Sequence, residues 1–599
     1  MPKKWNFAPH DVQQVRTLSG QIKCSPLLAQ ILATRGYNTQ ESARAFLNAK
    51  LTDLIDPNEL PGVGKATDII VQAVQDKRRI TIYGDYDVDG VTSTSILWHC
   101  LQLLGAKVDY YIPSRLEEGY GLNCDALRQL HEEDPDRLVI SVDCGIASIA
   151  EGKLAQELGL DLIITDHHNL KAELPPALCH VHPRLPGTDY PFKDLCGAGV
   201  AFKIAWCICQ RLGDNGKATP RMREFLLMAT GLCAIGTVAD VVPLLGENRV
   251  IVRYGLQSIM ARAPIGLRAL MKVAKLEGTL RSDDVAFVIG PRINAAGRLG
   301  QARLAVELLT TEDEDRAAQL SEYLDQLNKN RQTVERRIFK QAKELVEEHP
   351  GGSESPAFVL SHDDWHPGVI GIVASRVCER FERPAILIST KQADKGQGSG
   401  RTFAGFNLYE GIKASAQHLE RFGGHKAAAG LRVDPAHIDD FRTAFVDYVT
   451  EHHHPTSSDY ALKIDAEVRL ADINRNAVLE LDVFGPYGAA NRKPRFAAMN
   501  VELVEPPRTM GDGNRHLSLR VRHYNRVMRC IAFGKGEWAD EIEAVNGPIS
   551  ICFTPTISSY QGYERVELRL IDWNPATPSA PAQTSETAKP AKDKADVPY

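Results

Sequence analysis

One short stretch, residues 79–90, limits the folds open to this chain more than any other. An apolar, partly β-branched run is followed there directly by three alternating carboxylates and a glycine. Residues two apart on an extended segment point the same way, so Asp85, Asp87 and Asp89 are expected to converge beyond the end of a buried strand. Three like charges at one point repel each other unless a divalent cation neutralises them. The stretch therefore predicts a buried strand that ends in a metal site.

Two other binding motifs resemble this region but lack required residues. An EF-hand loop needs a Glu six residues after its glycine, where this chain has Ile96, and a helix before it, where we expect a strand. A P-loop needs a glycine where this chain has Glu59 and a Ser or Thr where it has Ala66. We therefore interpret residues 61–66 as an ordinary turn.

From residue 66 onward the pattern alternates between helices and strands. We expect helices at 66–77, 91–104, 123–133 and 147–158, and strands at 79–83, 107–112, 138–142 and 161–165. This alternation is typical of a parallel sheet with helices on both faces. Ligands of such sheets bind outside the carboxyl ends of the strands, where the three carboxylates are expected.

Two further strand ends carry side chains that bind metals. One strand leads to Asp143, and the next leads to Asp166, His167 and His168. A single Asp at a strand end is commonly a helix cap, but three such ends at one sheet edge favour a metal centre. Asp240 is the only carboxylate of an apolar segment, and a buried Asp is rare unless it is paired or bound to metal. We take it as the last ligand.

These motifs carry a family resemblance. In order and spacing they match the four motifs of the DHH phosphoesterase superfamily, at residues 84–90, 142–145, 166–168 and 236–240. The sequence Gly-Gly-His-Lys-Ala-Ala-Ala-Gly at 423–430 resembles the signature of the DHH-associated substrate-binding domain. By length and order of parts, about residues 60–570 resemble the RecJ family of bacterial single-strand-specific DNA exonucleases.

The resemblance implies two divalent ions, with Mn²⁺ preferred or Mg²⁺. It implies one ion bound by Asp85, Asp87 and Asp143 and another bound by Asp89, Asp143, His167 and Asp240, so that Asp143 bridges the two. Carboxylates with one imidazole suit both metals, and the imidazole favours Mn²⁺. Two ions of this kind promote hydrolysis of a phosphodiester without a protein nucleophile.

Other residues near the site have less specific roles. Asp166 is expected to hold an imidazole from outside the metal shell. By resemblance His168 is catalytic and faces the substrate phosphate, although a structural histidine remains an alternative. Arg115, in a glycine-bearing loop, is expected to bind phosphate or else to be solvated. Asn294 and Arg298 are expected in a turn that closes the catalytic half.

We expect a catalytic domain at 66–309, a connecting helix at 310–348 and a second α/β domain at 349–450. A coiled-coil dimer is a weaker interpretation of the helix, because Arg331 interrupts its apolar seam. In the second domain we expect a helix that carries Arg376 and two glycine-rich loops, at 396–402 and 423–426. These elements offer Arg376, Ser399, Arg401 and His425 as ligands for the phosphates around the scissile bond.

The last part of the chain has a different pattern. Short alternating strands at 460–573 predict an all-β barrel of the OB type. Residues 513–536 hold several cations and no acidic residue, so Arg520, Arg522, Arg526 and Tyr524 are expected to contact single-stranded nucleic acid. A solvated strand face is the alternative. We expect a helical N-terminal extension at 1–65 and a disordered tail at 574–599.

Composition excludes several classes of protein. A net charge of −6 argues against indiscriminate coating of nucleic acid, so a nucleic-acid surface must be local. Twelve cysteines without a Cys-x-x-Cys pair indicate neither a disulfide framework nor a zinc site. We find no apolar run of membrane-span length and no signal peptide, and we expect a cytoplasmic protein.

The resemblance implies a 5′-to-3′ exonuclease on single-stranded DNA that releases 5′-mononucleotides in recombination and repair. We expect a monomer without membrane contact that works with a single-strand-binding protein and a helicase. The first alternative is a DHH-type phosphodiesterase on short oligonucleotides or small nucleotides, for which the barrel would be superfluous. The second is a non-catalytic replication scaffold of the same fold, which is expected to have lost metal ligands.

Overall fold

The computed structural model describes residues 3–115, 118–348, 351–392, 395–456, 458–560 and 563–576. They form two compact units. The first comprises residues 39–460 and 483–493, and the second comprises the chain up to residue 38, residues 461–482 and the chain from 494 onward. The predicted N-terminal extension is therefore divided between the two units, and most of the predicted tail lies outside the described residues.

A five-stranded parallel sheet forms the centre of the first unit, in the order β3-β2-β4-β5-β6. Its strands are β2 (Arg79–Tyr83), β3 (Lys107–Tyr111), β4 (Leu138–Val142), β5 (Asp161–Thr165) and β6 (Cys179–Val181). Three of the four predicted strands have these bounds unchanged. The strand order reverses next to β2, and such switch points are where ligands bind in parallel sheets.

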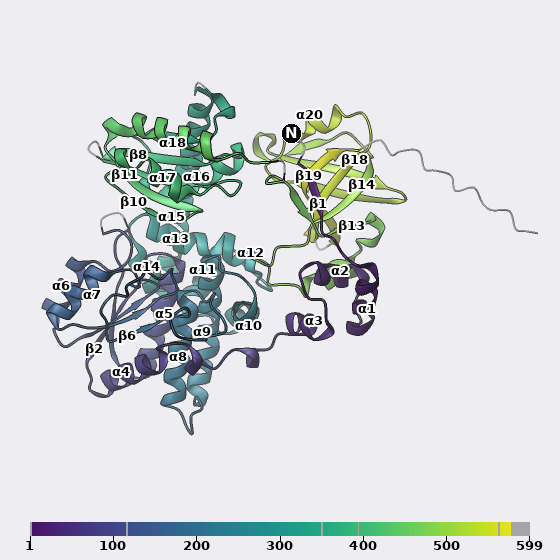
Figure 1. Cartoon of the computed structure of the whole chain (residues 1–599). Helices are drawn as coiled ribbons and strands as arrows, with labels where there is room; N and C mark the ends of the chain where they lie inside the picture. The colour runs from purple at the N-terminus through teal and green to yellow at the C-terminus, as the bar shows by residue number, and fades with distance from the viewer. Residues whose placement is uncertain are drawn as a thin grey trace, which may run out of the picture. The chain divides into compact units, whose positions relative to one another are not determined.

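Helices cover both faces of this sheet, as predicted (Figure 1). One face packs against α6 (Cys124–Glu133) and α7 (Ile149–Leu158), and the other against α4 (Val63–Gln75), α5 (Val88–Leu103) and α8 (Gly197–Arg211). α5 begins three residues earlier than predicted, because an Asp87 carboxylate oxygen accepts hydrogen bonds from the amides of Asp89 and Gly90 and so caps the helix. Asp89 thus lies in the first helical turn. The prediction that it points the same way as Asp85 and Asp87 along an extended segment is wrong.

An all-helical part follows the sheet, with α9 (Pro220–Ala239), α10 (Gly246–Arg262), α11 (Ile265–Val273), α13 (Gly290–Arg298) and α14 (Ala302–Thr310). By length and composition alone α9 is long and apolar enough to cross a membrane. Of its most apolar window, however, 67% is buried inside the protein, as in a core helix. Asp240 directly follows the last residue of α9.

The helix α15 (Glu314–Glu348) connects two hydrophobic cores of this unit. Leu324 and Leu327 belong to the core of the catalytic domain, whereas Ile338 and Val346 belong to the core of the second domain. The apolar side of the helix is therefore covered by the chain itself. This arrangement favours the predicted connecting helix over the coiled-coil alternative.

The second domain is built on a mixed sheet in the order β10-β11-β9-β8-β7. Its strands are β7 (Phe358–His362), β8 (Ala385–Gln392), β9 (Lys395–Arg401), β10 (Arg421–Gly424) and β11 (Ala428–Val433). Helices α15 and α16 (Pro367–Phe381) cover one face, and α17 (Leu408–Ala414) and α18 (Ile438–His452) cover the other. The predicted loop at 396–402 is therefore wrong, because nearly all of it is the central strand β9.

The glycines of β9 are explained by packing. A Cβ atom on Gly398 would lie 2.6 Å from Leu431 Cδ1, and one on Gly396 would lie 2.8 Å from Val433 Cγ1. The alternate glycines thus make room for apolar side chains of β11 on one face. Ser399 and Arg401 alternate with them. The predicted loop at 423–426 is half right, because Gly423 and Gly424 end β10 and the next two residues form the turn.

The second unit contains a closed barrel, with the strand order β13-β14-β18-β19-β17-β16-β15 and a further pairing of β14 with β16. Its strands are β13 (Ala466–Glu467), β14 (Phe496–Leu503), β15 (Arg508–Met510), β16 (His516–His523), β17 (Arg526–Ala532), β18 (Ile549–Tyr560) and β19 (Tyr563–Pro575). The N-terminal strand β1 (Trp5–Phe7) pairs with β12 (Leu462–Ile464), and Trp5 Nε1 donates a 2.7 Å hydrogen bond to Asp572. The N-terminal helices α1 (Val12–Ile22) and α2 (Pro26–Thr34) complete this unit.

We predict that Leu324→Ala destabilises the first unit by about 2–5 kcal/mol, because it leaves a cavity in the core next to α15. Calorimetric unfolding measures the effect. Gln326→Ala, at an exposed position of the same helix, is the matched control and should change the stability by no more than about 0.5 kcal/mol. Equal effects of the two substitutions would contradict the role of α15 in the core.

Candidate metal centre and phosphate site

The predicted metal ligands meet at the carboxyl ends of β2, β4 and β5. Three overlapping groups each have one ligand atom per residue within 4.8 Å of the others: Asp85 with Asp87 and Asp143, Asp89 with His167 and Asp240, and Asp143 with His167 and His168. Asp143 and His167 each belong to two of these groups. The arrangement offers two adjacent metal positions, and Asp143 lies where it can serve both.

Glycines let α8 and α9 approach these carboxylates closely. A Cβ atom on Gly197 would lie 2.6 Å from Asp143 Cβ, and one on Gly236 would lie 2.6 Å from Asp89 Oδ1. Gly197 also begins α8, and its amide and that of Ala198 donate hydrogen bonds of 2.6 and 2.9 Å to the two Asp89 oxygens. The amino end of α8 thus stabilises a buried negative charge.

Asp143 has a strained backbone. Its φ of 60° lies in the left-handed region, which non-glycine residues rarely adopt and which costs about 1–3 kcal/mol. The Tyr120 hydroxyl donates a 3.1 Å hydrogen bond to the Asp143 carbonyl. Strain of this kind persists only where the surroundings enforce it. The carboxylate of this strained residue lies among the ligand atoms of Asp85, Asp87 and His167.

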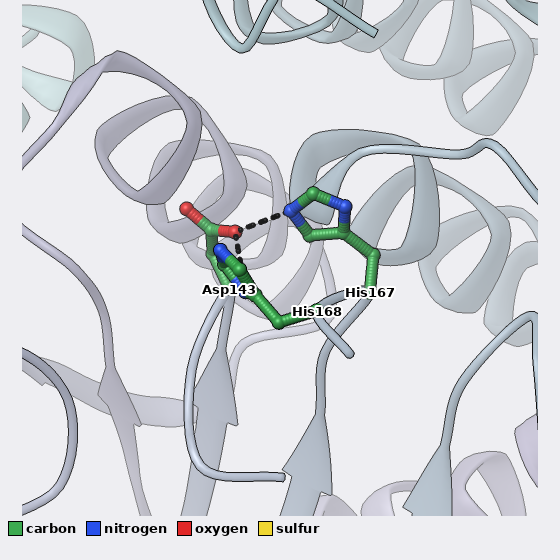
Figure 2. Close-up of side chains that lie close together, drawn as sticks. All are labelled: Asp143, His167 and His168. Atoms are coloured by element: carbon green, nitrogen blue, oxygen red, sulfur yellow. Dashed lines mark ion pairs between the residues drawn. The ribbon is translucent and has the colours of Figure 1, made fainter. Parts of the chain in front are cut away.

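His167 directs Nε2 at three carboxylates. The atom lies 3.1 Å from Asp143 Oδ1, 3.6 Å from Asp240 Oδ2 and 3.8 Å from Asp89 Oδ2. Figure 2 shows this ring and the ring of His168 beside the Asp143 carboxylate. Burial and the neighbouring charge of His168 lower the pKa of His167 to about 4, so the ring is neutral at pH 7. A neutral imidazole among carboxylates is suited to bind a metal ion rather than to form ion pairs.

Asp166 has a different environment from the other acidic residues. It accepts hydrogen bonds from the amides of Ile146, His167 and His168 and lies 2.7 Å from Nδ1 of the His168 ring. Burial would raise its pKa, but the bond and charge of His168 lower it to about 2. Burial would lower the pKa of His168, but Asp166 raises it to about 9. His168 is therefore a cation held by Asp166, and its side chain is 43% exposed.

The donor atoms fit divalent cations. Asp85 Oδ1, Asp143 Oδ1 and His167 Nε2 are buried and have no hydrogen-bond partner among the described residues. Burial and the charge of Asp87 raise the pKa of Asp85 well above its usual value, and burial together with Asp89 and Asp87 raises that of Asp240 to about 8. Unpartnered buried oxygens and one imidazole nitrogen are what a Mn²⁺ or Mg²⁺ ion would complete.

Four arginines gather beside the Asp85 and Asp87 end of the metal centre. Burial, followed by the charges of Arg115, Arg331 and Arg401, lowers the pKa of Arg298 to about 10. Burial and Arg115 also lower the pKa of Arg401, whose Nη1 donates to Ser399 Oγ at 3.2 Å. Arginines that lower each other's pKa in this way repel each other, and they are suited to bind an anion such as a phosphate. Arg331, which the sequence prediction did not include, belongs to this group but is already paired with Glu335 and Asn328 of its own helix.

The segment that carries Asn294 and Arg298 is the helix α13, so its prediction as a turn is wrong. The chain enters α13 from a π-helical turn and has Pro291 in the first helical turn, where proline is tolerated. A Cβ atom on Gly297 would lie 2.2 Å from the carbonyl oxygen of Tyr86. Tyr86 stands between Asp85 and Asp87 in the sequence. Arg298 Nη1 donates to the Gly368 carbonyl at the start of α16. α13 thus contacts both Tyr86, in the loop that carries Asp85 and Asp87, and the second domain.

Other predicted phosphate ligands have different surroundings. Arg115 lies 5.0 Å from the ring centre of Tyr86, next to Asp85. Arg376 pairs with Glu335 at 2.9 Å and stacks over Phe339, so its described contacts join α16 to α15. His425 lies exposed in the turn between β10 and β11. For all of the predicted phosphate ligands, Arg298, Ser399 and Arg401 included, binding of phosphate stays a prediction.

On the barrel, the predicted DNA-binding residues lie on one hairpin of β16 and β17. Arg520, Arg522, Tyr524 and Arg526 are exposed, and Tyr524 at the hairpin tip is 76% exposed with a φ of 52°. Arg522 and Tyr524 also line a cleft of about 1510 Å³ that the barrel forms with α1 and α2. Arg522 lies 3.9 Å from Glu502 across the strands, so the face is not purely basic. Contact with nucleic acid stays a prediction.

The chain is similar to known proteins along most of its length. It matches the DHH family, N-terminal domain, over residues 79–232, the DHHA1 domain over 354–451 and the RecJ OB domain over 464–572. A single-stranded-DNA-specific exonuclease RecJ of Bacillus subtilis (strain 168) is 39% identical over 574 residues, which cover 95% of this chain and 70% of the relative. The chain belongs to the RecJ family.

RecJ of Escherichia coli (strain K12) is 33% identical over 87% of this chain and 90% of its own length. The crystal structure of RecJ from Thermus thermophilus in complex with Mn²⁺ aligns with a TM-score of 0.81 at 31% identity, over 97% of this chain and 80% of that one. RecJ from the same organism has also been solved with Mg²⁺. The predicted family, the three-part fold with its OB barrel, and a divalent-metal cofactor are therefore confirmed. The assignment of individual ligands stays a prediction.

We predict that Mn²⁺ raises the melting temperature of the wild type by several degrees, because ions bind only the folded state. Asp143→Asn should lose most of this stabilisation, since Asp143 is shared by two groups of ligands. Without metal, the variant should melt above the wild type, because one of several mutually repelling carboxylates is neutral. Thermal unfolding in EDTA and in Mn²⁺ measures both effects.

The control for this experiment is Asp125→Asn, whose carboxylate is exposed on α6. It should respond to Mn²⁺ like the wild type. Full Mn²⁺ stabilisation of Asp143→Asn would exclude Asp143 as a bridging ligand.

Proposed function

We propose that this chain is a metal-dependent exonuclease that degrades single-stranded DNA from the 5′ end, releases 5′-mononucleotides and acts in recombination and repair. One observation carries the proposal: in this member of the RecJ family, a cluster of arginines lies beside a metal centre that has two positions for ions. The relatives named above are single-stranded-DNA-specific exonucleases. The centre suits hydrolysis of a phosphodiester, and the arginines suit a second phosphate of the same strand.

The chain's own residues bind and orient the scissile phosphate. Asp85, Asp87 and Asp143 would hold one cation, and Asp89, Asp143, His167 and Asp240 the other. Bound divalent cations would stabilise charge on the phosphate oxygens and lower the pKa of a water molecule. His168, held by Asp166 at 2.7 Å and partly exposed, would donate to a phosphate oxygen on which negative charge increases. No side chain has to act as a nucleophile.

The arginine cluster accounts for the polarity in this proposal. Arg115, Arg298, Arg401 and Ser399 would bind a terminal 5′-phosphate beyond the first nucleotide. An internal phosphate at the same place would carry one negative charge less. It would also be linked to a further nucleotide. The strand therefore enters with its 5′ end, and the first phosphodiester lies at the metals. The exposed basic hairpin with Tyr524 would hold more distant nucleotides.

Two alternatives make different demands on the chain. A phosphodiesterase for small nucleotides needs the metal centre but neither the barrel nor its exposed cations. A non-catalytic scaffold needs no metal ligands, whereas every predicted ligand is present and faces the centre. We further expect a cytoplasmic monomer that receives its strand from a helicase and a single-strand-binding protein.

The first test uses one oligonucleotide labelled separately at its 5′ and 3′ ends, with Mn²⁺, next to its duplex. We expect immediate release of a 5′-labelled mononucleotide from the single strand only. Asp143→Asn should lower kcat on the order of 10³-fold, because several kcal/mol of charge stabilisation are lost. Early release of the 3′ label would reverse the polarity, and hydrolysis of dinucleotides with intact long strands would favour the small-substrate enzyme.

The second test compares oligonucleotides with a 5′-phosphate and a 5′-hydroxyl. We predict that Arg401→Gln lowers kcat/KM for the phosphorylated strand about 10- to 100-fold, the worth of a charge-assisted hydrogen bond, with little change for the hydroxylated strand. Arg432→Gln, at an exposed position of β11, is the control and should alter neither value. Equal losses on both strands would remove the terminal phosphate from this site.

A further inference from the structure

An exposed aromatic residue lies on an unusual turn of the catalytic domain. Phe287 is 76% exposed, although phenylalanine is among the residues most often buried. It belongs to the π-helical turn η3 (Val285–Ile289), whose first and last residues are fully buried. π-helical turns are rare and are found frequently at functional sites. The turn is thus anchored in the core while it presents one ring to solvent.

A second exposed apolar residue follows the metal ligand Asp240. Val241 is 69% exposed and has a φ of 63°, which is a genuine outlier for a β-branched residue. Burial of the side chain does not offset the free energy that this conformation costs. Strain and apolar exposure at one position point to a function outside the folded core.

One contact, between α9 and η3, joins the two segments of the chain that carry these residues. η3 packs against α9, and a Cβ atom on Gly290 would lie 3.9 Å from the Cβ atom of Ala239. Val241 is two residues beyond Ala239, and Phe287 is three residues before Gly290. Asp240 lies between Ala239 and Val241. Val241 is therefore the direct neighbour in sequence of a metal-centre residue, and Phe287 lies three residues from the contact between η3 and α9.

We propose that Phe287 and Val241 form a stacking platform for a base of the single strand on the 3′ side of the scissile phosphate. This inference rests on the proposed exonuclease function. Bases stack on aromatic rings without regard to sequence, which suits a nuclease that must accept every nucleotide. Phe287 and Val241 carry no charge, so they would contact a base rather than a phosphate of the strand.

The side of the scissile bond follows from the two ends of the centre. The arginine cluster lies next to Asp85, Asp87 and Tyr86, through Arg115 and Gly297. The platform adjoins Asp240, which belongs to the other group of ligands. If the 5′-phosphate occupies the arginines and the scissile phosphate the metals, the remaining strand leaves toward Asp240. A base near the second or third nucleotide then reaches the platform.

The test removes single bases and single side chains in combination. Oligonucleotides with a 5′-phosphate carry one abasic nucleotide at position 2, 3, 4 or 8, and kcat/KM is measured for each with Mn²⁺. For the wild type we expect a loss of about 5- to 50-fold at position 2 or 3, the value of one base stack, and none at position 8. For Phe287→Ala the intact strand should already show that loss, and removal of the base should cost nothing more.

Matched variants separate stacking from folding. Phe287→Trp should keep the sensitivity to the missing base, and Met260→Ala, at an exposed apolar residue of α10, should behave as the wild type. Val241→Gly relieves the left-handed strain, so it should raise the melting temperature while it weakens the sensitivity.

The outcomes distinguish this proposal from the one it rests on. A wild type that leaves the intact strand undegraded would overturn the exonuclease function itself. A wild type that degrades the strand, while Phe287→Ala keeps the full loss at every abasic position, would overturn the platform alone. Disappearance of the loss in Phe287→Ala and its return in Phe287→Trp would support the platform.

Discussion

The structure of the catalytic domain depends on the repulsion among carboxylates that are buried together. At separations of 4.8 Å or less, two ionised carboxylates repel each other by on the order of 3 kcal/mol at an effective dielectric constant of about 20. The chain limits this cost in specific ways. The amino end of α8 donates two hydrogen bonds to Asp89, and Asp166 is neutralised by His168. Asp85, Asp143 and Asp240 are left with raised pKa values, which bound cations would lower.

Close approach of the backbone is the second requirement, and it explains the glycines of the motifs. Gly90, Gly197 and Gly236 each lie where a Cβ atom would come within 2.6 Å of a ligand residue or its backbone. Three helices can therefore begin or pass directly at the metal centre. Without these glycines the carboxylates would be farther apart, and one ion could not contact ligands from several elements.

Much of this arrangement could be predicted from residues, and the failures have physical causes. The strands 79–83, 138–142 and 161–165 were predictable because β-branched runs end there in polar residues at the same sheet edge. The helical position of Asp89 was not, because the capping bond from Asp87 overrides the alternation of the sequence. Ser399 and Arg401 were assigned to a loop, since glycine at every second position is also typical of loops. Only the partner strand β11 shows that those glycines make room for Val433 and Leu431.

The two ends of the site carry opposite charges, with carboxylates at one end and arginines at the other. Asp85 and Asp143 have buried oxygens without hydrogen-bond donors, whereas Arg298 and Arg401 lie among other arginines that lower their pKa. Arg115 lies over the ring of Tyr86, the residue between Asp85 and Asp87, so the two sets of charges adjoin each other at this loop. A divalent cation at one end and a phosphate at the other would neutralise both sets at once. In the proposed function the bound strand would balance the charges of this domain, so binding of metal and binding of the 5′ end would favour each other.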